Sequence, residues 1–267
     1  MLDLLEFLLE LLVNLADVDR VSHGYGPQSQ QAVETRRRTD AAVDAFLAWL
    51  ASRPDWESTT VIITADHGFD TMRGTPMRFV DVLAAAGLRG LAVVGDGGVG
   101  HVYLMAPSDP GQDARRLAAA RRLALAHPGI AEALYLKANA ADGGERHTIG
   151  TVHGDWHLRH ARAGDLLLVT RPGLQIVDGS KEEAKLLGNH GGPAERSVPL
   201  IVLGGAPVGD APECRHVTPA DIGRTVQACL GLPETRRLDG RGIVAKARGR
   251  VLHGLCLTSP VPTVTPP

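Results

Sequence analysis

The sequence predicts an α/β protein whose core is a mostly parallel sheet flanked by helices. Two short apolar runs, residues 11–16 and 60–64, have the character of buried strands, and a polar segment with apolar residues at helical spacing separates them. Strand, helix and strand in this order form the βαβ unit of a parallel sheet. An Asp and a His follow each run, at the carboxyl end of a strand, where open α/β sheets bind their ligands.

The core is expected in two pieces, residues 1–75 and residues 186–256. The first piece holds the βαβ unit. In the second piece, residues 200–203 read as a buried strand. A helix is expected over residues 218–230, because Thr218 suits the N-cap and Pro219 the first helical position.

Residues 76–185 differ in character from the core, and we interpret them as an inserted α+β lobe. The expected lobe elements are helices at 79–86 and 113–127 and strands at 91–94, 101–105 and 165–170. The Pro- and Thr-rich residues 257–267 are expected to form a disordered tail.

Composition excludes several classes of function. A net charge of −2 gives no basic footprint for a nucleic-acid polymer. Three cysteines that lie far apart give neither a disulfide framework nor a paired metal spacing. The apolar start contains acidic residues and has no Lys or Arg before Arg20, unlike a signal peptide, and it is too short for a membrane span. The sequence as it stands therefore predicts a cytoplasmic protein with no membrane partner.

Three segments carry residues suited to metal binding. Asp19 and His23 offer an oxygen and a nitrogen four residues apart, although this spacing is common by chance. Asp66 and His67 follow a strongly apolar strand, where a metal site and a turn-capping Asp beside a core His are equally good readings. His190 lies between Asn189 and a pair of glycines, in a loop open enough for a metal or a phosphate, or in a plain glycine-rich turn.

Four further histidines, His147, His153, His157 and His160, crowd one part of the lobe. They could bind a metal, but no neighbouring Cys or acid completes a familiar spacing. We favour a solvent-facing position or a place at the rim of a substrate site.

Taken together, the ordered set of segments resembles the alkaline-phosphatase superfamily, and within it the type I phosphodiesterase/nucleotide pyrophosphatase branch. The resemblance rests on residues 19–27, on Asp66-His67-Gly68 and on His190-Gly191, and it runs over residues 11–242. It implies a metal-dependent hydrolase of small phosphate esters or diesters with two divalent metal ions, which we expect to be zinc.

The resemblance also assigns the ligands. One zinc is expected to be held by Asp19, His23 and His190, and the second by Asp66 and His67. Such a metal pair activates the nucleophile and stabilises the leaving oxygen of an in-line phosphoryl displacement.

The chain departs from the family at its start. Relatives have a further ligand Asp and a Thr or Ser nucleophile upstream, and neither can be placed in residues 1–10; Thr64 lies within a strand and is no substitute. We therefore expect an N-terminally truncated core without a visible catalytic nucleophile and with slow turnover.

Several alternatives follow from this departure. The chain could be non-catalytic, or it could be one half of a split enzyme that needs an N-terminal partner fragment. Self-association through an unpaired apolar strand edge is a further expectation. Phosphonoacetate hydrolase, sulfatase and mutase chemistry use similar ligands and stay open.

Overall fold

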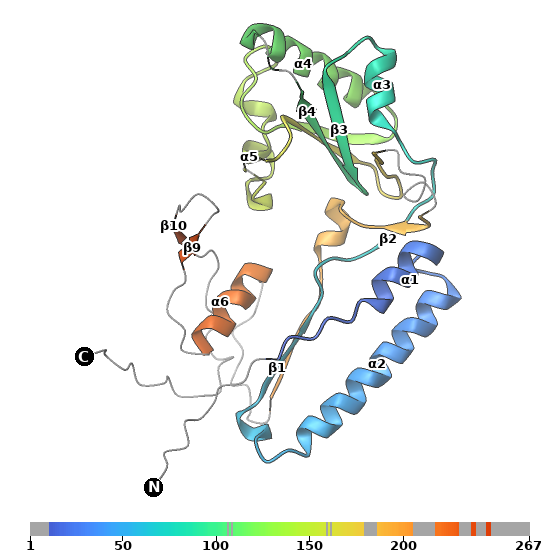
Figure 1. The fold of residues 1–267 in the computed structure, drawn as a ribbon, viewed down its shortest axis with the longest axis vertical. Coiled ribbons are helices and arrows are strands. Elements are labelled where there is room, and N and C mark those ends of the chain that lie inside the picture. Colours follow the sequence, from blue (N-terminus) through green and yellow to red (C-terminus); the bar gives the residue numbers. More distant parts are fainter. Residues whose placement is uncertain are drawn as a thin grey trace, which may run out of the picture. The chain divides into compact units, whose positions relative to one another are not determined.

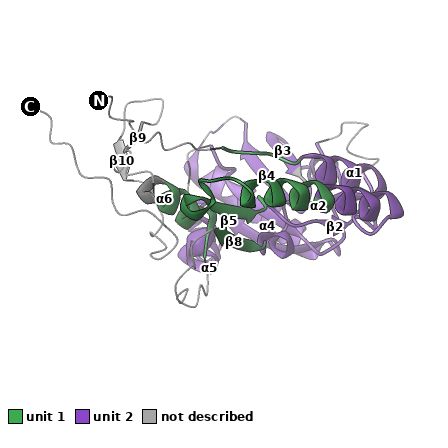
Figure 2. Cartoon of the chain, turned by 90° about the horizontal axis from the view of Figure 1, so that it is seen from below, with its two compact units in different colours: residues 1–15, 40–66, 199–267 green, residues 16–39, 67–198 purple. Residues whose placement is uncertain are grey.

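The computed structural model describes residues 11–105, 107, 109–158, 160, 162–178, 186–204, 217–229, 236–238 and 244–246. The chain divides into two compact units (Figure 2). Unit 1 comprises residues 1–15, 40–66 and 199–267, and unit 2 comprises residues 16–39 and 67–198. The predicted tail at 257–267 lies outside the described residues. None of the helices in the described ranges combines the length and the apolarity that crossing a membrane requires.

Unit 2 contains a four-stranded antiparallel sheet with the strand order β3-β4-β6-β5. Figure 1 labels β3 and β4 of this sheet, together with the helices α3 and α4. Its helices and strands are α1 (Asp17–Tyr25), the start of α2 (Gln30–Ala51), β2 (Asp70–Thr71), α3 (Phe79–Ala85), β3 (Leu91–Asp96), β4 (Val99–Leu104), α4 (Pro110–Ala126), β5 (Ile130–Tyr135), α5 (Ile149–Val152), β6 (Leu166–Thr170) and β7 (Gly188–Asn189). Short 3-10 turns add η2 (Glu145–His147), η3 (Gly154–Trp156) and η5 (Pro193–Arg196).

The sheet of unit 2 is covered on both faces because side chains alternate along β5 and β6. Ala133, Tyr135, Leu166 and Leu168 join the main apolar cluster, which includes Phe79 of α3 and residues of α4. Their sequence neighbours Leu134, Leu167 and Val169 point to the opposite face of the sheet. There they form a second apolar cluster with Ile149 of α5. All five residues of β6 are buried, so this strand is the centre of the unit.

Unit 1 contains the rest of α2, η1 (Trp56–Ser58), β1 (Thr60–Thr64), β8 (Leu200–Gly204), α6 (Pro219–Cys229), β9 (Arg236–Leu238) and β10 (Val244–Lys246). β1 and β8 pair antiparallel, and β9 and β10 do the same. The first turn of α6 is closed by Asp221, whose carboxylate accepts hydrogen bonds from the backbone N–H and the hydroxyl of Thr218.

Most elements of the lobe were predictable, and the structure confirms α3, the β3–β4 hairpin, α4 and β6 close to the expected ranges. The sequence analysis missed β5. The expected α/β character is present, but the parallel sheet is not confirmed, because every strand pair in the described part of the chain is antiparallel.

The predicted strand at residues 11–16 is wrong. Residues 11–15 are neither helix nor strand and are exposed, and α1 begins directly after them at Asp17. A strand forms only against a neighbour that takes up its backbone hydrogen bonds. Among the described residues, β1 pairs with β8 alone. No described strand pairs with its other edge, where residues 11–16 were predicted to lie. Asp19 and His23 therefore lie on a helix and not at the end of a strand.

A partly buried polar network fastens α4 to β5. The side chain of Arg121 donates to the carbonyl of Ala133 at 2.8 Å and to Asp142 Oδ2 at 2.9 Å, and the hydroxyl of Tyr135 donates to the same Asp142 oxygen at 2.8 Å. Burial works against the ionised carboxyl of Asp142, but the hydrogen bonds from Tyr135 and Arg121 prevail and lower its pKa. Burial and the bond to Asp142 raise the pKa of Tyr135.

The network makes stability depend on pH. A carboxyl whose pKa is lowered by folding adds stability above its unfolded pKa of about 3.9, and that stability is lost as the pH falls through the folded value. Replacing Asp142 by Asn is expected to reduce the free energy of unfolding at pH 7 by roughly 1.5–3 kcal/mol, the range for hydrogen bonds to a charged group. The difference should shrink as the pH falls through the lowered folded pKa of Asp142, as measured by urea unfolding. Asp17→Asn, in an exposed ion pair with Arg20, should change stability by at most about 1 kcal/mol. A loss for Asp142→Asn that stays constant from pH 7 to pH 2 would contradict this assignment.

Candidate metal centre

Helix α1 brings the first two candidate ligands to one face. Asp19 and His23 are four residues apart, which places them one above the other on an α-helix. Asp17 and Asp19 lie in the first turn, where carboxylates are favoured by the helix dipole, and His23 lies in the last turn. The buried Ser22 faces inward, and its hydroxyl donates to the carbonyl of Val18 at 2.6 Å.

The C-terminal end of α1 is tied to β7, which leads directly into His190. The N–H of Leu187 donates to the carbonyl of His23, and a ring nitrogen of His23 lies 3.0 Å from the carbonyl of Gly188. A Cβ atom on Gly188 would collide with the carbonyl of Ser22 and lie 2.8 Å from Pro27 Cδ, so only glycine permits this approach. β7 also pairs with β2, three residues after His67.

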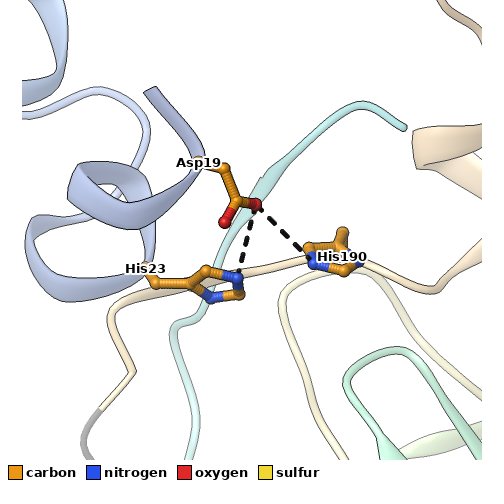
Figure 3. A group of neighbouring side chains, drawn as sticks. All are labelled: Asp19, His23 and His190. Carbon is orange, nitrogen blue, oxygen red and sulfur yellow. Dashed lines mark ion pairs between the residues drawn. The ribbon is translucent and has the colours of Figure 1, made fainter. Parts of the chain in front are cut away.

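These ties bring four candidate ligands together within unit 2. Asp19 Oδ1 lies 3.5 Å from His23 Nε2, 3.8 Å from His67 Nε2 and 3.9 Å from His190 Nε2. Figure 3 shows Asp19 and His23 reaching from the helix towards His190 on the facing segment. The rings of His67 and His190 stack with their centres 3.5 Å apart.

The histidine tautomers suit metal binding. A carbonyl oxygen only accepts hydrogen bonds, so Nδ1 of His23 donates to Gly188, and Nδ1 of His67 donates to the carbonyl of Gly68 at 2.9 Å. In the neutral imidazole, each Nε2 then carries the lone pair and faces Asp19. Metal-binding histidines characteristically donate their other ring N–H to such an acceptor.

The donor set and its spacing fit a divalent ion. Among the residues that the structure describes, the group of potential ligands whose atoms all lie within 4.8 Å of one another is Asp19, His23 and His190. Ligands at about 2.0–2.2 Å from a tetrahedral zinc are roughly 3.3–3.6 Å apart, close to the observed separations. Oδ1 of Asp19 is buried and has no hydrogen-bond partner, although the side chain as a whole is 43 % exposed. Imidazole nitrogens together with a carboxylate oxygen are ligands that zinc prefers.

Two residues that the sequence analysis missed surround this group. The ring of Phe69 packs edge-on against His23 and His190, with ring centres 4.8 Å and 5.4 Å apart. Glu195 is buried, its backbone carbonyl accepts from the N–H of Gly68 at 2.6 Å, and its Oε2 has no hydrogen-bond partner in the structure. Burial raises the pKa of the Glu195 carboxyl. The signal for both was their closeness in sequence to His67 and His190.

Asp66 belongs to unit 1, where it follows β1 with an exposed side chain, so its part in a second metal site remains a prediction. Of the lobe histidines, His153 pairs with Glu132 at 2.8 Å and stacks on Trp156. His157 and His160 are exposed. A place for these residues at a substrate rim also remains a prediction.

Solved structures similar to this chain come from ectonucleotide pyrophosphatase/phosphodiesterase 5. The murine protein is 20% identical with a TM-score of 0.51, over 69% of this chain and 44% of that one. Its inactive variant in complex with AMP gives 20% identity and a TM-score of 0.52, over 70% and 45%. The human protein gives 17% and 0.50, over 70% and 44%. At these identities the likeness shows the fold, and this chain spans less than half the length of the structures it matches.

No curated protein matches the chain. The family described as type I phosphodiesterase / nucleotide pyrophosphatase, in contrast, matches residues 10–193. This range contains Asp19, His23, Asp66, His67 and His190. The chain belongs to the type I phosphodiesterase/nucleotide pyrophosphatase family, within the alkaline-phosphatase superfamily.

Proposed function

We propose that this chain supplies the metal-binding part of a phosphoryl hydrolase that cleaves phosphate esters or diesters. The observation that carries the proposal is the convergence of three imidazole Nε2 atoms on the inward Oδ1 of Asp19. Family membership gives the reaction class, phosphodiesterase or nucleotide pyrophosphatase.

The residues have separate tasks in this proposal. Asp19, His23 and His190 would hold one zinc ion, which, when bound, supplies Lewis-acid stabilisation of a phosphoryl oxygen. The carbonyls of Gly188 and Gly68 keep the rings of His23 and His67 in the tautomer that presents Nε2. The ring of Phe69 keeps water away from one side of the histidines.

The finer assignments concern the second ion and the substrate. Asp66 and His67 are proposed to serve a second zinc. The stacking of His67 on His190 is consistent with neighbouring sites. The murine relative has been solved with AMP, which supports a small nucleotide or a similar phosphorylated molecule as substrate.

The first prediction concerns metal stoichiometry. Chelator-stripped protein should bind one Zn²⁺ more tightly than a second, because Asp19, His23 and His190 form a complete set of three ligands. His190→Ala should weaken the tighter site by about 100-fold or more, since even outer partners of a ligand contribute 10–100-fold. Isothermal titration calorimetry measures both sites.

The control for this titration is His157→Asn. His157 is exposed and has a φ of 55°, which Asn tolerates. Its replacement should leave both affinities unchanged. Two equally tight sites, or a His190→Ala variant that binds zinc like the parent, would refute the ligand assignment.

The second prediction concerns turnover. Hydrolysis of bis(4-nitrophenyl) phosphate should require added Zn²⁺, and Asp19→Asn should lower kcat/KM by about 100-fold or more, because the variant loses the negative charge at the centre of the site. Hydrolysis of 4-nitrophenyl phosphate in parallel distinguishes a diesterase from a monoesterase.

The assay is run on the chain alone and on the chain co-expressed with the upstream segment of a relative. Zinc-dependent turnover in the second sample only would favour the split-enzyme alternative. No zinc-dependent turnover in either sample, from protein that binds zinc, would favour the non-catalytic one.

A further inference from the structure

Behind His190 lies a buried pair of side-chain amides. Asn189 is 6% exposed and Gln175 is 1% exposed. Nδ2 of Asn189 donates to Oε1 of Gln175 at 2.8 Å, and Oδ1 of Asn189 accepts from the backbone N–H of His190 at 2.9 Å. Asn189 thus uses its donor on one side and its acceptor on the other, which no apolar side chain and no carboxylate of this size can do.

The other backbone group of His190 is held from the opposite direction. Its carbonyl accepts from the N–H of Gly98 at 3.1 Å, at the tip of the β3–β4 hairpin. Gly97 has a φ of 60°, and a Cβ atom there would collide with the His190 carbonyl and lie 3.1 Å from Oδ1 of Asn189. Glycine is required at this tip both for the conformation and for the approach.

The groups that hold the backbone of His190 are themselves anchored in the apolar core of unit 2. The backbone carbonyl of Gln175 accepts from the N–H of Met77 at 2.9 Å, and the N–H of Ile176 donates to the carbonyl of Gly97 at 2.8 Å. Ile176 has no exposed surface and belongs to the main apolar cluster. Gln175, the hairpin tip and the backbone of His190 are therefore fixed to the same sheet.

From these contacts we infer that Asn189 and Gln175 are positioning residues, which set the metal affinity of the site by fixing the backbone from which the His190 ring projects. The inference rests on the proposed metal-binding function. With both backbone groups of His190 held, the side-chain torsions alone decide where Nε2 lies, and stacking on His67 and packing against Phe69 restrict those.

The test compares zinc affinity with thermal stability in the full chain. Asn189→Ala removes both contacts of the pair. Gln175→Met keeps the length of the side chain and the Asn189–His190 bond but removes the acceptor that orients the Asn189 amide. Both variants should bind Zn²⁺ 10–100-fold more weakly than the parent in competition with a chromophoric chelator. The visible spectrum of the Co²⁺-loaded protein should change with them, because it reports the ligand geometry.

The control is Ile149→Val, a conservative change in the second apolar cluster, which does not contain Ile176. It should lower the Tm of the metal-free protein and leave the zinc affinity and the Co²⁺ spectrum unchanged. This separates positioning from a general loss of stability.

The outcomes are distinct. If the parent binds zinc and Gln175→Met binds it equally well with an unchanged Co²⁺ spectrum, the positioning role is wrong and the proposed function stands. If Ile149→Val weakens zinc binding as much as the amide variants do per degree of Tm lost, the effect is one of stability, and the positioning role is again wrong. If the parent binds no zinc, the proposed function fails, and this inference fails with it.

Discussion

A carboxylate oxygen that is turned away from water needs positive charge or a hydrogen-bond donor beside it. Oδ1 of Asp19 is in this position, because it is buried, it has no hydrogen-bond partner in the structure, and three imidazole Nε2 atoms face it. In the tautomers set by the carbonyls of Gly188 and Gly68, Nε2 of His23 and Nε2 of His67 carry no proton to donate to it. A divalent cation bound between the rings and this oxygen, as proposed, would supply that positive charge. The arrangement of α1, β2 and β7 makes sense as the frame for such a cation.

The candidate ligands could be named from the sequence, whereas the elements that carry them were only partly predictable. Asp19, His23, His67 and His190 stood out through the resemblance to the family, because each motif on its own has an equally common structural reading. The apolar residues 11–15 read as a strand because an apolar run does not report whether a neighbouring strand is present to pair with it, and in the structure these residues are neither helix nor strand.

The pairing of Asn189 with Gln175 could not be predicted from the sequence for a similar reason. Asn189 and Gln175 are polar residues in loops and at strand ends, where such residues are commonest, and only the fold brings them into contact. Their burial is a tertiary property. β5 was missed because its residues follow the Pro128-Gly129 break without alternation of polar and apolar side chains, as expected for a strand covered on both faces.

The segment that carries His190 is held more firmly than the helix that carries Asp19 and His23. His190 is fastened through Asn189, Gln175 and the hairpin tip to a sheet whose central strand is buried on both faces. Asp19 and His23 are held through the end of one helix of nine residues, by the contacts of His23 with Leu187 and Gly188. Segments with few buried contacts open far more often than the core. The residence time of a bound ion would therefore be set by how often α1 lifts from β7, so that substitutions at the end of this helix change the rate of metal exchange.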